Sequence, residues 1–314
     1  MITLEHVYWL TGLMTGGAAI VNARDRSHPR WINNTAFWGL YAVTFLFGSR
    51  LPDVVSGYLV LAMVAFASVR GLGTSGGESV TQEERGAGAE RWGNKLFWIA
   101  LLIPAATIAG TFLFKSPAFA PHVDQKQVTV ISLAVGCVVA IIAGYVILRP
   151  PLSAPITEAR RLLDSIGWAA VLPQMLAALG AVFAAAGVGT VVSTLAQRWI
   201  PLNVGWAVVA TYTIGMAVFT MIMGNAFAAF PVMTAGIGLP LIVGKFGGDP
   251  IVMSAVGMLS GFCGTLMTPM AANFNIVPTA LLDLDEYAVI RVQIPTALML
   301  LFVNTVIMNF FVFR

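Results

Sequence analysis

The chain has 314 residues, of which 58% are hydrophobic and 10% charged, and its formal net charge is +3. Soluble domains have roughly 45–50% apolar and 25% charged residues, so this composition excludes an ordinary soluble globular protein. Several apolar stretches reach the about 20 residues that a helix needs to cross a membrane. We therefore predict an all-α, polytopic transmembrane helix bundle in contact with the lipid bilayer. The basic residues lie in short connections and do not indicate a nucleic-acid partner.

Apolar stretches before residue 150 predict a five-span N-terminal bundle over residues 1–150. The predicted spans cover about 4–21, 34–48, 54–69, 96–114 and 128–148. The only long polar connection among them, residues 71–93, is rich in Gly, Ser and Glu and lacks apolar periodicity. Such a composition predicts a mobile loop.

Basic residues in the connections predict the orientation of these spans. Alternate connections carry ten of them: Arg24, Arg26, Arg30, Arg70, Arg85, Arg91, Lys95, Arg149, Arg160 and Arg161. The intervening connections carry three, which are Arg50, Lys115 and Lys126. Because cytoplasmic loops are enriched in Lys and Arg, the N-terminus is expected outside the cytoplasm.

Residues 151–314 form the second predicted half, which begins with an interfacial amphipathic helix. We expect Arg160 and Arg161 of this helix at the lipid headgroups. Residues 168–201 predict either one kinked span or a span followed by a short amphipathic piece, and we favour the second. Clear spans follow at about 202–223 and 294–313, which brings the expected total to about eight.

The stretch 224–278 is apolar, yet Gly and Pro interrupt it repeatedly, so we predict broken or re-entrant helices. Residues 226–244 could either span the membrane or form a re-entrant hairpin. An unsatisfied backbone group in hydrocarbon costs several kcal/mol, so such breaks persist only where protein or a water-filled cavity covers them. Many secondary transporters build their substrate site from discontinuous helices near the membrane midplane.

Two of these breaks carry side chains that form hydrogen bonds. The candidate substrate-binding residues are Asn225, Thr265, Thr268, Asn273 and Asn275. Amides and hydroxyls both donate and accept, while backbone N–H groups at helix N-termini attract a carboxylate. Such groups could hold a small organic anion without an arginine. A candidate sodium site lies near Gly224, Asn225, Thr268 and Asn273.

Charged groups are scarce in this part of the chain. Between Trp199 and Leu282 the charged residues are Lys245 and Asp249, and we expect no buried carboxylate or histidine chain of the kind that relays protons. The chain also lacks the motifs of serine hydrolases, zinc proteases and phosphate-binding loops. We predict that the protein is not an enzyme and has no cofactor beyond a coupling ion such as sodium.

Three segments within residues 172–278 carry a resemblance: LPQMLAALGAVFAAAGVG, GNAFAAFPVMTAGIG and GTLMTPMAANFNIVP. The chain resembles a bacterial inner-membrane family, formerly of unknown function, whose members form the larger of two subunits of a 5-oxoproline (pyroglutamate) transporter. The resemblance extends loosely over the whole length. More distantly, the chain is similar to the ion-transporter superfamily of organic-anion carriers, in which two hairpins with Asn- and Thr-containing tips bind substrate and sodium.

This resemblance implies a subunit of a secondary transporter that moves 5-oxoproline across the bacterial inner membrane by ion-coupled alternating access, with a periplasmic N-terminus. It implies substrate or ion contacts at the five candidate residues. Because no Ser-Asn-Thr tip and no second hairpin half is evident, it also implies a second membrane subunit or another copy of the chain as partner. Two alternatives stay open: a carrier of another organic anion, such as a dicarboxylate or sugar acid, and a non-transporting membrane scaffold.

Overall fold

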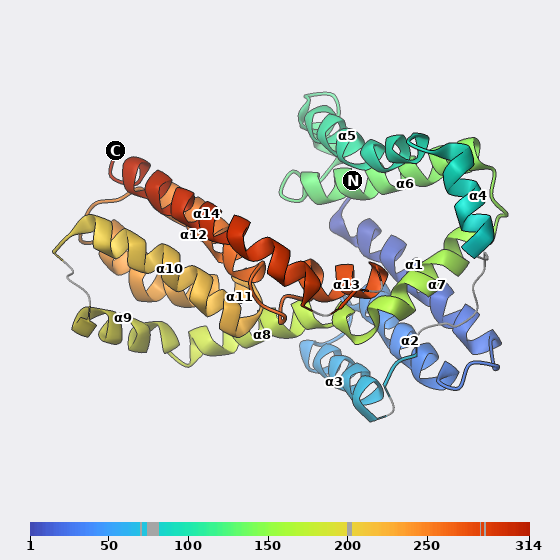
Figure 1. The fold of residues 1–314 in the computed structure, drawn as a ribbon, viewed down its shortest axis with the longest axis horizontal. Coiled ribbons are helices and arrows are strands. Elements are labelled where there is room, and N and C mark those ends of the chain that lie inside the picture. The colour runs from blue at the N-terminus through green and yellow to red at the C-terminus, as the bar shows by residue number, and fades with distance from the viewer. Residues whose placement is uncertain (70, 74–81, 200–202, 283, 286) are drawn as a thin grey trace. The chain divides into compact units, whose positions relative to one another are not determined.

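The computed structural model of the protein describes residues 1–69, 71–73, 82–199, 203–282, 284–285 and 287–314. These residues form an all-α, polytopic arrangement of helices, which confirms the predicted fold class (Figure 1). The chain divides into two compact units, Met1–Gly167 and Trp168–Arg314. The amphipathic helix expected to open the second half therefore belongs to the first unit.

The first unit contains the five helices predicted as N-terminal spans and two further ones. Its helices are α1 (Leu4–Arg24), α2 (Trp31–Phe47), α3 (Asp53–Val69), α4 (Gln82–Trp92), α5 (Lys95–Lys115), α6 (Val128–Leu148) and α7 (Ala154–Ile166), with a short 3-10 turn at Ala120–His122. Close packing of α1 on α2 depends on a small residue, because a Cβ atom added to Gly12 would lie 2.6 Å from Leu46 Cγ.

The polar connection after α3 differs from its prediction. Gln82–Trp92 forms the helix α4, so a mobile loop is the wrong prediction for these residues. Gln, Glu, Ala and Arg favour a helix without any apolar period, which explains why the periodicity alone missed it. Arg70 and residues 74–81 lie outside the described residues.

Helix α7 also differs from its prediction. Arg160, expected at the headgroups, has a side chain that is only 12% exposed and pairs with Asp25. Asp164, one turn further along α7, has a fully buried side chain. The expectation that the chain holds no buried carboxylate is therefore wrong, because Asp164 lies outside the region between Trp199 and Leu282 on which it was based.

Among the described residues, six helical stretches are long and apolar enough to cross a membrane. They are Lys95–Lys115, Val128–Leu148, Ala154–Ala185, Gly205–Met223, Ala226–Val243 and Ala288–Phe311. The four charged residues of Ala154–Ala185 all lie in α7, so the apolar part of that stretch is residues 167–185. The apolar helices Asp53–Val69 and Pro250–Thr265 are shorter.

The second unit is a bundle whose main helices lie side by side (Figure 1). Its elements are α8 (Leu172–Ala185), α9 (Val188–Trp199), α10 (Gly205–Met223), α11 (Ala226–Met233), the π-helix η3 (Thr234–Val243), α12 (Pro250–Thr265), the π-helical turn η4 (Ala272–Ile276), α13 (Val277–Leu282) and α14 (Ala288–Phe311). A left-handed Gly187, at φ 70°, separates α8 from α9, as expected for a span followed by a short piece.

Residues 226–243 form one continuous helical stretch, because η3 follows α11 without a gap. Of the two alternatives for this segment, the structure therefore has the long helix and not the re-entrant hairpin. The turns widen into a π-helix around Pro240, whose nitrogen cannot donate a helical hydrogen bond.

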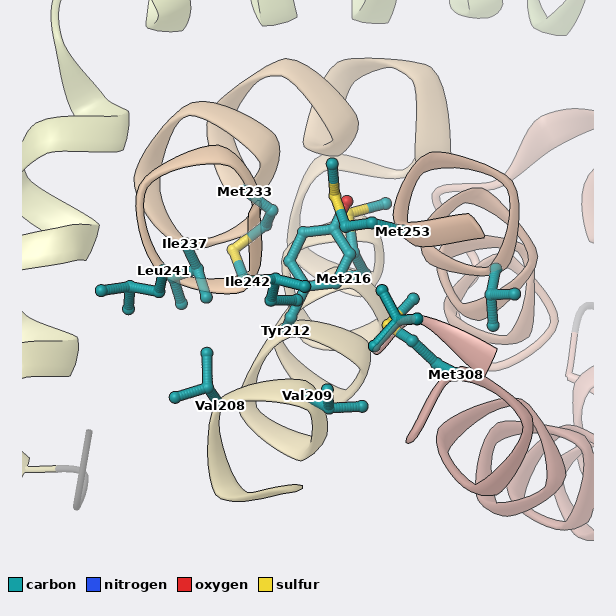
Figure 2. Packing of buried hydrophobic residues seen from close by; sticks show 12 residues of the cluster. Val208, Val209, Tyr212, Met216, Met233, Ile237, Leu241, Ile242, Met253 and Met308 are labelled. Carbon is teal, nitrogen blue, oxygen red and sulfur yellow. The ribbon is translucent and has the colours of Figure 1, made fainter. Parts of the chain in front are cut away.

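An apolar core joins α10, η3, α12 and α14. Figure 2 shows the ring of Tyr212 in the middle of this core, with the side chains of Met216, Met233 and Met253 around it. The Tyr212 hydroxyl lies 3.2 Å from the hydroxyl of Thr234, so its one polar atom has a partner inside the bundle. This packing fixes how α10 lies against its neighbours.

Helices α10 and α12 run in the same direction. A Cβ atom added to Gly257 would lie 2.6 Å from the Tyr212 ring, and one added to Gly264 would overlap the Ala217 carbonyl oxygen. Residue numbers therefore rise together along the two helices, whose backbones approach closely at the small residues of α12. Consequently, the C-terminal ends of α10 and α12, where both sequence breaks begin, lie at the same end of the bundle.

Candidate functional site

The first break is a tight turn between α10 and α11. Gly224 adopts the left-handed conformation, with φ 72°, and its N–H donates to the Thr220 carbonyl oxygen at 2.7 Å. Asn225 then begins α11 as its N-cap, because its Oδ1 accepts from the Phe227 N–H at 2.8 Å.

The helices on either side of this turn run antiparallel. Gly215 of α10 contacts Met233 of α11, and Tyr212 reaches Thr234, so numbers fall along α10 as they rise along α11. The break therefore lies at one end of two consecutive helices. This is where the span predicted for about residues 202–223 was expected to end.

The second break follows α12 and touches the first. Thr268, in the non-helical segment after Thr265, donates its hydroxyl to the Met221 carbonyl oxygen in the last turn of α10, at 2.9 Å. A Cβ atom added to Gly224 would lie 2.7 Å from Met270 Cβ and 2.8 Å from Met270 O. The two breaks therefore meet backbone to backbone.

Asn275, in η4, holds the second break together. Its side chain is fully buried, and its Nδ2 donates to the carbonyl oxygens of Thr265 at 2.9 Å and Thr268 at 2.6 Å. The Thr265 carbonyl lies where α12 has ended, and a helix end needs such partners from outside the helix. The Thr268 carbonyl also accepts a longer bond from the Ala271 N–H, at 3.4 Å. Asn275 thus replaces the hydrogen bonds that a continuing helix would have formed.

Most of the predicted site residues occupy this one cluster. Thr265, Thr268 and Asn275 are joined by the bonds described above, and Asn225 follows Gly224 in the turn that contacts Met270. The Thr265 hydroxyl donates to the Phe262 carbonyl oxygen of its own helix, at 2.6 Å. The side chains of Asn225, Thr265 and Thr268 thus bond to backbone groups. Asn273 belongs to η4, but its side chain lies outside the described part of the structure.

Within the described part of the chain, two polar atoms near the breaks lack a hydrogen-bond partner. They are Oδ1 of Asn275 and Oγ1 of Thr220, both buried. A buried polar atom without a partner costs about 1–3 kcal/mol, so each could bind a polar group or cation that enters the cluster. Sequence analysis missed Thr220, although its position one helical turn before Gly224 was visible.

Three aromatic rings lie beside the polar cluster. The centroids of Phe227 and Phe262 are 6.0 Å apart, and those of Phe262 and Phe274 are 6.2 Å apart. The rings come from the start of α11, the end of α12 and η4, so they mark the same end of the bundle. Phe227 and Phe274 are 59% and 39% exposed, which leaves an apolar surface next to the buried amide.

Two cavities of the structure lie away from this cluster. A cavity of about 670 Å³ in the second unit is lined by α9, α10, α11 and η3, with Trp206, Ile214 and Met233 among its lining residues. A second one of about 480 Å³ lies between α1, α6 and α7. Neither is lined by Thr220, Thr268 or Asn275, so these two cavities give no access to the cluster.

A comparison with protein families places the chain. The model of a family described as "protein of unknown function (DUF979)" matches residues 5–313. The chain belongs to this family. The match runs through both units of this DUF979 chain, so both are parts of what the family shares. No curated protein and no solved structure matches it.

In this DUF979 chain, the two breaks touch at Gly224, where there is no room for a larger side chain. Gly224→Ala is expected to lower thermal stability, because the new methyl group would meet Met270 and the left-handed backbone disfavours a Cβ atom by about 1 kcal/mol or more. Thermal unfolding of the purified protein measures the loss.

Gly247→Ala is the matched control for this prediction. Gly247 has nearly the same φ, 68°, but nothing lies within 4 Å of an added Cβ atom. The difference between the two variants therefore isolates the contact with Met270. Equal losses would contradict the close approach of the two breaks.

Proposed function

We propose that this chain is a subunit of a secondary transporter that moves a small organic anion, 5-oxoproline, across the bacterial inner membrane by ion-coupled alternating access. One observation supports this proposal most. Two buried polar atoms without a partner among the described residues, Asn275 Oδ1 and Thr220 Oγ1, lie next to the two places where the helices are interrupted. The identity of the anion rests on the resemblance in the sequence.

The chemistry of 5-oxoproline suits these groups. Its lactam N–H is a donor for Asn275 Oδ1, and its carboxylate accepts from a hydroxyl such as that of Thr220 or from N–H groups at the start of α11. No charged side chain is needed for such a site, because in an apolar bundle neutral donors act at short range in a low dielectric. Carbonyl and amide oxygens at the same breaks suit sodium as the coupling ion.

Transport requires that the cluster open, since its polar side chains here bond to backbone groups. The contact between Gly224 and Met270 is the one that must separate for a ligand to reach Asn275. In alternating access, the two breaks at this end of α10 and α12 would be in contact in one state and separated in the other. A second membrane subunit or another copy of the chain would supply the remaining walls, and the N-terminus would be periplasmic.

Uptake of labelled 5-oxoproline tests the proposal. Cells lacking their own uptake system would carry the chain alone, the partner subunit alone, both, or neither. We expect uptake only where the chain is present, and competition by unlabelled 5-oxoproline. Stronger competition by a dicarboxylate or sugar acid would favour another substrate. Uptake that depends on the partner alone would instead support a scaffold role.

A further inference from the structure

A network of charged and polar groups lies inside the first unit, where α7 packs on α1. Asp164 of α7 has a fully buried side chain, and its Oδ1 accepts from Trp38 Nε1 at 2.8 Å and Asn22 Nδ2 at 3.2 Å. Its Oδ2 has no hydrogen-bond partner. One oxygen of a buried carboxylate is thus fully engaged while the other is left bare.

The cation of this network is turned toward another acid. Arg160 donates from its Nη2 to Asp25 Oδ2 at 2.6 Å and from Nε to Asn22 Oδ1 at 2.9 Å. Its Nε lies 3.6 Å from Asp164 Oδ2, beyond hydrogen-bond reach. The guanidinium is thus shared between two carboxylates and bonded to only one of them.

The charges of the network do not balance. Two carboxylates, Asp25 and Asp164, face one guanidinium, so full ionisation leaves one negative charge. The hydrogen bonds from the Ser27 hydroxyl and from Arg160 hold the pKa of Asp25 below its usual value, so Asp25 stays ionised. The uncompensated charge therefore falls on Asp164.

Among the residues that the structure describes, the other groups around Asp164 do not supply the missing charge. From α1 it faces Asn22 and from α2 it faces Trp38 and Asn34, all of which are neutral. Within α7, Arg161 pairs with Glu158 at 2.7 Å. A carboxylate that is withdrawn from water and lacks its own counter-ion is more stable in the protonated form.

We propose that Asp164 is a proton-binding site, in which Oδ2 carries a proton while Arg160 bonds to Asp25 and loses that proton when Arg160 turns to Asp164. The proton comes from water and returns to water, and no other bond changes. Arg160 needs to move little, because it already lies between the two acids. The two proposed arrangements of the network differ by one proton.

Infrared difference spectroscopy of the full-length protein in lipid, titrated across pH, tests this site. The wild type is expected to show the C=O stretch of a protonated carboxylic acid at neutral pH, and Asp164→Asn is expected to lack it. Asp249→Asn, at the N-cap of α12 in the other unit, is the matched control and should keep the band. A missing band in the wild type, or an unchanged band in Asp164→Asn, would overturn the proposal.

Two neighbouring substitutions should move the titration in opposite directions while leaving Asp164 in place. Asp25→Asn frees Arg160 for Asp164, so the band should disappear at a pH lower by about one to three units. Arg160→Gln removes the cation closest to Asp164, whose charge favours the ionised form. The band of the protonated acid should therefore persist to higher pH. If neither variant shifts the titration, the exchange of Arg160 between the acids is wrong, even if Asp164→Asn fails to fold.

If the chain is the transporter proposed above, this proton is a candidate coupling ion. Asp164→Asn would then abolish the dependence of uptake on a pH gradient. The infrared titration needs no substrate and no partner, so its outcome is independent of the proposed transport. If the wild-type chain showed no uptake but titrated as expected, transport by this chain would be rejected and the proton site would stand.

Discussion

Replacement of Asn275 by alanine is expected to lower both thermal stability and transport. The substitution removes two hydrogen bonds and leaves the carbonyl oxygens of Thr265 and Thr268 without that partner inside the bundle. The Thr268 carbonyl keeps its bond from the Ala271 N–H, whereas the Thr265 carbonyl loses the Asn275 amide. A buried group left without a partner costs about 1–3 kcal/mol, so a loss of that size is expected. The substitution also removes the bare Oδ1 atom, so uptake should fall to background. Thermal unfolding and uptake of labelled 5-oxoproline measure the two effects.

Asn304→Ala is the control for this experiment. Asn304 is also an asparagine of the second unit, but the bond from its amide to Cys263 Sγ is a long one, at 3.6 Å. We expect a small change in stability and normal uptake. If the two variants behaved alike, Asn275 would have no special role at the break.

Arg160→Gln is expected to destabilise the first unit, by an amount that depends on pH. Removal of one partner from a fully buried ion pair costs on the order of 3 kcal/mol, and the cost should be lower here because Asp25 is 29% exposed. In this variant the folded state binds a proton at Asp164 more tightly than the unfolded chain does. That stabilisation is present at low pH and is lost as the pH rises through the titration of Asp164, so the stability deficit should grow with pH. Thermal unfolding at several pH values measures it.

The double variant Arg160→Gln/Asp164→Asn separates this cause from simple loss of packing. It removes the Asp164 carboxylate together with the neighbouring guanidinium, so most of the pH dependence should vanish. A deficit in the double variant as large and as pH-dependent as in Arg160→Gln would show that Asp164 is not the group left without compensation.

The membrane-spanning helices could be predicted because their signal is local. Runs of apolar residues between polar connections placed α1, α2, α3, α5 and α6 within a few residues of where they lie. The helix α4 escaped because a polar helix shows no apolar period. The hairpin alternative at 226–244 failed because Pro231 and Pro240 are absorbed within a helical stretch, in which a change of hydrogen-bond pattern replaces a break.

The polar cluster was predictable in its members but not in its geometry. Gly, Pro and Asn marked both breaks, and Asn225 before an apolar stretch is itself an N-cap signal that accounts for its role in the structure. That Thr268 bonds to Met221, 47 residues earlier, depends on the parallel packing of α10 and α12. No local pattern encodes that contact.

The Asp164 network was even less predictable from the sequence. Asn22 and Asp164 are 142 residues apart, and the spacing of Arg160 and Asp164 on one amphipathic helix is that of an ordinary surface pair. Whether Arg160 and Asp164 form a solvated ion pair or part of a proton-binding site depends on whether Asp164 is buried. Burial arises only when α7 packs on α1.

The most direct test of the transport site compares uptake of labelled 5-oxoproline by Thr220→Val and Thr279→Val, each expressed with the partner subunit. Both residues are buried threonines of the second unit, but the Thr279 hydroxyl bonds to carbonyls of its own helical turn, whereas that of Thr220 has no partner. The account predicts that Thr220→Val loses most uptake without losing thermal stability, while Thr279→Val transports normally. Normal uptake by Thr220→Val would contradict a substrate site at the two breaks.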